Sequence, residues 1–201
     1  MNFDLVLPLS IFIVLSTITP GPNNLLLTAS GLNFGFRATI PHLFGIHCGI
    51  YSLAILCALG LGSVLLAEPR LVILLKVFGS LYLAYLAWMI LGLRADAPGV
   101  TSINNEPLSV RQAFVFQFSN PKAWFMATTG INLALPITDS MAYAALFLCL
   151  GFATLGLVCN FVWIGMGRIL QNAFTQPIYR RWINATLALL TALTIFMIWL
   201  A

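Results

Sequence analysis

The segment STITPGPNN, residues 16–24, interrupts an apolar stretch that contains no charged residue between Asp4 and Arg37. An uncharged stretch of this length predicts a transmembrane segment. The two prolines and the glycine within it remove helical hydrogen bonds. Lipid tolerates the freed backbone groups only where they are buried in protein or line a watery cavity. The sequence therefore predicts a broken transmembrane helix, which is how many secondary transporters hold a small polar solute.

The composition is that of an integral membrane protein. Of the 201 residues, 61% are hydrophobic and only 7% are charged, with a mean hydropathy of +1.00. A soluble domain carries about 25% charged residues, so lipid must be the solvent for most of the surface. The net charge of +4 comes from nine basic residues that form no patch, which argues against a nucleic-acid partner. The four cysteines lie inside apolar stretches without metal-binding spacing and are expected to act as small apolar side chains.

Six apolar stretches are each long enough to cross a bilayer, which takes about 20 residues. They cover residues 4–32, 39–66, 70–93, 111–136, 140–167 and 182–201. The longer polar segments, 94–110 and 168–181, are too short to be domains, so 1–201 is predicted to be one transmembrane domain. Residues 1–4 lack the basic start of a signal peptide, and the N-terminus is expected to be retained.

A faint internal repeat relates the two halves of the chain. The matching positions, each about a hundred residues apart, are Thr19-Pro20 with Asn120-Pro121, Gly45 with Gly151, and Gly60-x-Gly62 with Gly165-x-Gly167. Because each half has an odd number of spans, the second half enters the membrane upside down. We expect an all-α integral membrane fold of six transmembrane helices in two inverted three-helix repeats, with helices 1 and 4 broken near the midplane. The repeats cover about 1–93 and 111–201, joined by the linker 94–110. Coincidence is the alternative, because glycine and proline are common in membrane helices.

The basic residues predict the orientation of the chain. Six of them lie in the first, third and fifth loops: Arg37, Arg94, Arg111, Arg168, Arg180 and Arg181. The second and fourth loops have only Arg70, with Lys76 nearby. Basic loops stay in the cytoplasm, so both termini are expected on the periplasmic side. The alternative is a chance distribution of few charges.

The break in the first span is the first candidate site. Its residues are Thr19, Pro20, Gly21, Pro22, Asn23 and Asn24. A helix that restarts after the prolines presents free N–H groups and the positive end of a dipole, which suits a carboxylate. The two asparagines add neutral amides that both donate and accept hydrogen bonds. The alternative is a proline kink without a ligand, although packing alone does not need those amides.

A second candidate site is the segment Asn120-Pro121-Lys122 in the fourth span. Lys122 lies about 16 Å along a helix from Arg111, too deep for a terminal anchor. A charge at such depth costs at least about 2.5–3.5 kcal/mol on insertion scales, so we expect Lys122 to meet carbonyls, the Asn120 amide or a substrate carboxylate. The alternative is a span that begins nearer Phe118, from which the lysine reaches the interface.

Further polar and small residues are candidates for coupling or support: His47, Gly45, Gly49, Gly79, Tyr82, Tyr85 and Asn160. His47 is either a proton carrier or a histidine bonded to a neighbouring backbone or hydroxyl group. Gly45 and Gly49 form a small-xxx-small face for close helix contact. The aromatic residues of the third span are more typical of packing than of a binding wall.

The acidic residues narrow the function further. All five, Asp4, Glu68, Asp96, Glu106 and Asp139, lie at span ends or in loops, so no buried acid exists to relay protons or bind metal ions. A zwitterion fits better than a bare cation. The sequence has no nucleotide-binding loop and no nucleophile–base pair, so we expect neither an enzyme nor a bound cofactor or metal.

These residues resemble the LysE/RhtB family of amino-acid translocators. The matching motifs are Thr19-Pro20-Gly21-Pro22-Asn23, Gly35-Phe36-Arg37, Gly45-x-x-x-Gly49, Gly79-x-x-Tyr82-Leu83-x-Tyr85-Leu86-x-Trp88 and Asn120-Pro121-Lys122. They occur in the family's order over nearly the whole chain. Asn23-Asn24 and Gly35-Phe36-Arg37 look most like the branch that exports cysteine, O-acetylserine and similar neutral amino acids. The resemblance implies a six-span bacterial inner-membrane exporter, driven by the proton gradient and homodimeric. The acidic residue that some relatives carry in the second span is absent, which leaves coupling open.

We therefore expect a secondary transporter that exports small neutral amino acids, with the half-helices of spans 1 and 4 meeting at the site. Two alternatives stand beside it. One is a non-transporting membrane assembly subunit whose broken helices only pack. The other is a metal or ion exporter, which the missing buried acids disfavour.

Overall fold

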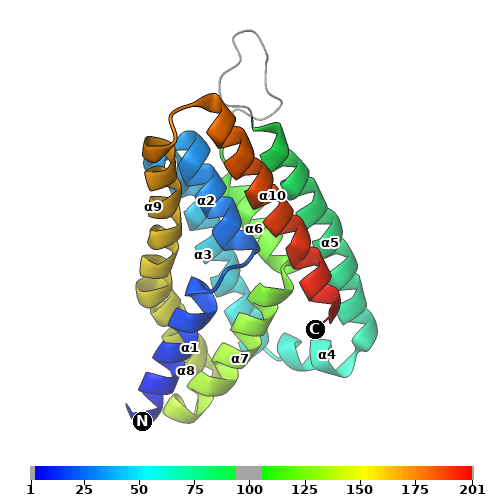
Figure 1. Cartoon of the computed structure of the whole chain (residues 1–201). Coiled ribbons are helices and arrows are strands. Elements are labelled where there is room, and N and C mark those ends of the chain that lie inside the picture. The colour runs from blue at the N-terminus through cyan, green and yellow to red at the C-terminus, as the bar shows by residue number, and fades with distance from the viewer. Residues whose placement is uncertain (1–2, 94–105, 201) are drawn as a thin grey trace.

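The computed structural model describes residues 3–93 and 106–200, and every regular element in this part of the chain is a helix (Figure 1). Residues 94–105, which include Arg94 and most of the predicted linker 94–110, lie outside the described residues. The helices are α1 (Val6–Ile18), α2 (Pro22–Phe34), α3 (Phe36–Ala58), α4 (Leu61–Ala67), α5 (Pro69–Gly92), α6 (Val110–Ser119), α7 (Pro121–Thr138), α8 (Met141–Gly151), α9 (Leu157–Ala173) and α10 (Pro177–Leu200), with a short turn η1 (Phe3–Leu5) and a π turn η2 (Phe152–Gly156).

The first predicted span is broken, as its prolines require. α1 ends at Ile18 and α2 begins at Pro22, with a bend of 55° between their axes. Pro22 occupies the first turn of α2, where its missing N–H costs no helical hydrogen bond. The fourth predicted span is broken in the same way, because α6 ends at Ser119 and α7 begins at Pro121.

Several helices are long and apolar enough to cross a membrane, so this is a multi-pass helical membrane protein. They are α3, α5, α10 and the continuous run from α8 through η2 to α9, and the bent pair α1–α2 adds a fifth span. The pair α6–α7 is not among them, because α7 carries Lys122, Asn132 and two prolines. The predicted count of six spans therefore stays a prediction.

Two predicted boundaries differ from the structure. The stretch 39–66 forms two helices, because Gly60 adopts φ +99° and ends the run of α3 before α4 begins. This left-handed conformation favours glycine. The predicted loop 168–181 shrinks to residues 174–176, since α9 continues to Ala173 and Pro177 starts α10.

The helices pack in three close pairs. α2 lies along α9, α3 lies along α6, and α5 lies along α10. Glycines set the distance in the first two pairs: a Cβ on Gly167 would collide with the Thr28 carbonyl of α2, and one on Gly45 would collide with the Val110 carbonyl of α6. Small residues allow this approach between membrane helices.

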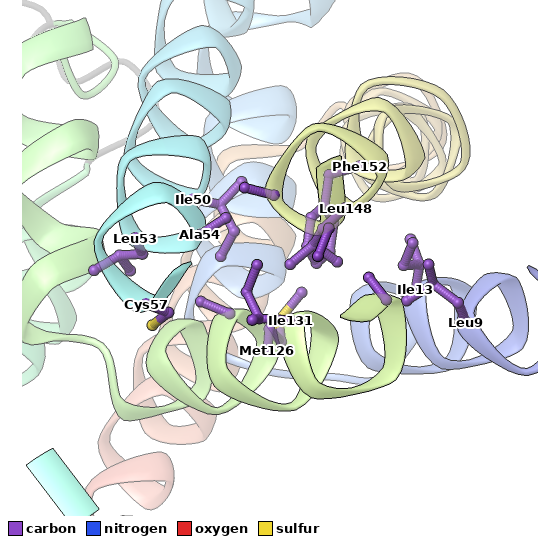
Figure 2. Packing of buried hydrophobic residues seen from close by; sticks show 14 of the residues in the cluster. Leu9, Ile13, Ile50, Leu53, Ala54, Cys57, Met126, Ile131, Leu148 and Phe152 are labelled. Atoms are coloured by element: carbon purple, nitrogen blue, oxygen red, sulfur yellow. The ribbon is translucent and has the colours of Figure 1, made fainter. Parts of the chain in front are cut away.

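The buried apolar side chains of the described residues form three clusters, of which the first joins α1, α3, α7 and α8. Figure 2 shows the first, where Ile13 of α1, Ile131 of α7 and Leu148 of α8 point toward one another. Large apolar side chains on the outside of α5 and α10, such as Phe78 and Phe196, are more than 60% exposed. An apolar exterior of this kind is stable only against lipid.

Candidate functional site at the two helix breaks

The two breaks meet in space, and Lys122 joins them. Its Nζ donates to the carbonyl oxygen of Thr19 at 2.9 Å and to the Thr19 hydroxyl at 3.0 Å. The lysine stem crosses Gly21 so closely that a Cβ there would lie 2.9 Å from Nζ and 3.1 Å from Cδ. Gly21 therefore provides the room for Lys122, and Lys122 satisfies a carbonyl that the broken helix has freed.

Asn24 closes the first break from within. Its Nδ2 donates to the carbonyls of Thr17 at 2.7 Å and Thr19 at 2.8 Å, and the side chain is only 3% exposed. Both carbonyls lie at the C-terminal end of α1, where the helix stops and they no longer have the N–H group four residues later as a partner. This asparagine is a structural brace across the bend.

Asn23 instead pairs with a residue that the sequence reasoning missed. Its Nδ2 donates to Gln117 Oε1 at 2.8 Å, and Gln117 Nε2 donates back to Asn23 Oδ1 at 3.1 Å. Gln117 also donates to the Ala113 carbonyl at 2.9 Å and is fully buried. The sequence did offer a signal for Gln117, because it places an uncharged amide inside an apolar span, three residues before Asn120.

The two restarted helices differ in how their first N–H groups are used. Asn120 caps α7, because its Oδ1 accepts from the Lys122 N–H at 3.1 Å. α2 has no side-chain cap. Its first helical bond runs from Leu25 N–H to the Gly21 carbonyl, so the N–H groups of Asn23 and Asn24 have no acceptor within the described residues. The start of α2 is therefore open to an anionic group.

His47 is held on both sides. Asn160 Nδ2 approaches His47 Nε2 at 3.2 Å, and the Tyr51 hydroxyl lies 3.1 Å from His47 Nδ1. An amide nitrogen can only donate, so Nε2 accepts and the proton of the neutral ring sits on Nδ1, directed at Tyr51. Tyr51 was also missed by the sequence reasoning, although it lies one helical turn after His47.

These groups surround an inner cavity of about 40 Å³. Its polar lining consists of Ser16, Thr17, Asn23, Asn24, His47, Asn120, Lys122 and Asn160, and none of its lining residues is acidic. The Thr17 hydroxyl is buried without a hydrogen-bond partner in the described part of the chain, although such groups usually have one. The volume suffices for a few water molecules at most, so a larger solute enters only after a conformational change.

An outer cavity of about 650 Å³ lies beside the inner one, between α4, α5, α7 and α10. Both cavities are lined by Gly21, Asn120 and Lys122. The prolines of the breaks, Pro20, Pro22 and Pro121, line the outer cavity only. Lys122 therefore stands at the boundary between the two spaces.

The other predicted site residues lie outside both cavities. Gly79 packs against the Ser119 carbonyl next to the second break. Tyr82 stacks on Phe116 with ring centroids 5.3 Å apart, and Tyr85 is 41% exposed on the outer surface. Gly79 and Tyr82 thus pack α5 against α6, and none of the three residues lines either cavity. Gly45 and Gly49 likewise pack against α6, where a Cβ on Gly49 would collide with Gln117.

A metal centre finds no support in the described residues. Among residues 3–93 and 106–200, no three histidine, cysteine or acidic side chains come close enough together to hold a metal ion.

Comparison with known proteins identifies the family. Residues 14–199 match the LysE type translocators. The chain is 31% identical over 180 residues to proteins named cysteine/O-acetylserine efflux protein from Escherichia coli strain K12 and from Shigella flexneri serotype 5b, with 89% of each chain covered. No solved structure matches the chain significantly.

The match extends from within α1 to nearly the end of α10 and so includes both helix breaks. The LysE type translocators are transporters and not enzymes, as we expected from the sequence, which has no nucleophile–base pair. The resemblance seen in the sequence motifs is thereby confirmed: the chain belongs to the family of LysE type translocators.

Proposed function

We propose that this translocator exports small neutral amino acids, or close derivatives of them, from the cytoplasm. The observation that carries the proposal is the inner cavity, which combines a lysine and an uncapped helix start with amides and has no acidic lining residue. Such a lining suits a net-neutral zwitterion and not a bare cation. Relatives named for cysteine and O-acetylserine efflux support a solute of this size.

Each end of the zwitterion has a complementary group. The solute carboxylate accepts from the free N–H groups at the start of α2 and from the Lys122 ammonium, which keeps one N–H beyond its two bonds to Thr19. The solute ammonium donates to the Asn160 amide oxygen across the cavity. Ile50 and Phe152, which also line it, leave little space for a large side chain.

The fold proposed for this activity has six spans in two inverted repeats, with α6–α7 as the fourth span. Corresponding contacts on the two sides of the molecule support the repeats. Gly62 lies against Thr128 of α7, and Gly167 lies against Thr28 of α2. A Cβ on Gly151 would collide with Ile13 of α1, just as one on Gly45 would collide with the Val110 carbonyl of α6. Inverted repeats place the solute site at their interface, where both breaks are found.

We place the chain in the bacterial inner membrane with both termini on the periplasmic side. The N-terminus and the C-terminal end of α10 lie at the same end of the molecule, opposite the turn between α9 and α10 (Figure 1). A Cβ on Gly35, two residues before Arg37, would lie 3.7 Å from the Arg168 guanidinium. The segments that carry Arg37 and Arg168 therefore lie together, at the end of the molecule opposite the termini. Basic segments at one end favour its cytoplasmic location.

In this orientation the outer cavity is the exit route. It reaches from the breaks toward α4 and the start of α5, at the end where the termini lie. Lys122 is the thin barrier between the inner and outer cavities. Towards the cytoplasm the barrier is thicker, because Asn184 donates to Asn33 at 3.0 Å and to the Leu93 carbonyl at 2.9 Å beyond the Asn23–Gln117 pair. Export is driven by the proton gradient, and a homodimer is the proposed assembly.

Counterflow in proteoliposomes tests the proposal. Vesicles loaded with unlabelled cysteine under a reductant should take up labelled cysteine in exchange, and a packing subunit would show no such exchange. Lys122→Gln keeps a donor for Thr19 but removes the charge, so we expect at least about tenfold weaker exchange from the lost charged hydrogen bond. Arg70→Gln removes an exposed charge of α5 that lines neither cavity and should exchange normally. Equal activity of both variants would refute the site.

A further inference from the structure

The hydrogen bonds of His47 suggest how proton binding could be linked to solute binding in the inner cavity. Asn160 turns its amide nitrogen toward His47 Nε2, and its amide oxygen accepts no hydrogen bond within the described part of the chain. Both side chains line the inner cavity and are about 95% buried. In this arrangement the Asn160 oxygen is available to a donor in the cavity, such as the ammonium group of a bound solute.

A proton on His47 Nε2 reverses this arrangement. The ring would then donate from both nitrogens, and the Asn160 amide nitrogen would face a second donor. Turning the amide by half a rotation relieves the conflict, because the oxygen then accepts from Nε2. The same oxygen is lost to the solute, and Tyr51 can still accept from Nδ1 at 3.1 Å.

We propose that Asn160 is the positioning residue that makes proton and solute binding mutually exclusive, with His47 Nε2 as the proton site. This proposal rests on the proposed export function. In the inward-facing state the proton leaves Nε2 to the cytoplasm, Asn160 turns its oxygen to the cavity, and the solute binds. In the outward-facing state the solute leaves, a periplasmic proton binds Nε2, and Asn160 turns back. Two ligands that compete for one acceptor give antiport.

The surroundings of His47 are otherwise neutral, with one exception. Tyr51 lies on the same helix, α2 contributes Asn23 and Asn24, α9 contributes Asn160, and α7 contributes the charged Lys122 to the same cavity. The test must therefore separate His47 from Lys122. His42, the other histidine, lies away from the inner cavity and serves as a matched control.

His47→Gln is the decisive variant. Glutamine can accept from Asn160 and donate to Tyr51 as the neutral ring does, but it cannot bind the extra proton. In proteoliposomes we expect cysteine counterflow to persist while accumulation driven by a pH gradient is lost. His42→Gln should keep both activities. If His47→Gln still accumulates cysteine when a pH gradient is applied, the inference is overturned and the export function still stands. If the unaltered protein shows no counterflow, export itself is refuted.

A second measurement follows the competition directly. The half-saturation concentration for cysteine should rise as the pH falls from about 7.5 to about 6 in the unaltered protein, by at most about tenfold per pH unit, which is the limit for one competing proton. It should not change with pH in His47→Gln. Asn160→Ala should bind the solute weakly at both values, and Lys122→Arg, which keeps a permanent charge, should retain the pH dependence. A pH dependence that disappears in Lys122→Arg would assign the proton to the lysine instead.

Discussion

Asn24→Ala should destabilise the protein, because this side chain braces the first break and does not hold the solute. The asparagine donates to two carbonyls at the end of α1, those of Thr17 and Thr19. Hydrogen bonds within membrane proteins average about 0.6 kcal/mol each. Thr19 retains Lys122 as a partner, but the Thr17 carbonyl is left without one, at a cost of about 1 kcal/mol or more.

The total loss is therefore about 2 kcal/mol, which corresponds to a fall in Tm of roughly 4–8 °C for a chain of this size on the scaling of soluble proteins. Thermal unfolding of the purified protein in detergent measures it, with Thr186→Ala as the control. The exposed Thr186 hydroxyl bonds only to the Trp182 carbonyl of its own helix, so its loss should leave Tm nearly unchanged. Asn24→Ala with unchanged Tm and lost exchange would show that Asn24 contacts the solute, and the assignment as a brace would be wrong.

Two further predictions test the packing and the exit route. Gly49→Ala should lower stability by about 1–3 kcal/mol, since the new methyl group would overlap Gln117 and the Phe114 carbonyl, whereas Gly165→Ala, with open space around it, should be neutral in the same unfolding assay. In a variant whose four cysteines are replaced, Thr128→Cys on the wall of the outer cavity should react with a membrane-impermeant thiol reagent added outside cells. Labelling of Thr128→Cys only from the cytoplasmic side would reverse the orientation and the route.

Local chemistry made the breaks predictable. Proline cannot donate a backbone hydrogen bond and clashes with the preceding turn, so residues 19–22 and 120–121 had to interrupt their helices wherever these packed. The same holds for the membrane class, because an apolar surface of this extent is stable only in lipid. The family motifs lie at these positions, which is why the family could be inferred from the sequence.

The roles of the two asparagines could not be predicted in this way. Asn23 and Asn24 are adjacent and chemically identical, yet one pairs with Gln117 of α6 and the other braces α1. Their side chains leave α2 about 100° apart, and which direction faces α6 depends on how helices distant in sequence pack. The aromatic residues Tyr82 and Tyr85 show the converse, since their motif is prominent in the sequence but lies outside both cavities.

The sequence by itself determined that this protein lies in the membrane, that two of its helices are broken, and that no acidic side chain is available deep in a span. Only the tertiary structure decided that Lys122 crosses Gly21 to reach Thr19 and that Asn160 meets His47. The physical reason is the range of the interactions. Helix breaks follow from sterics between neighbouring residues, whereas these contacts join residues about a hundred positions apart and exist only once glycine-lined helices have packed closely.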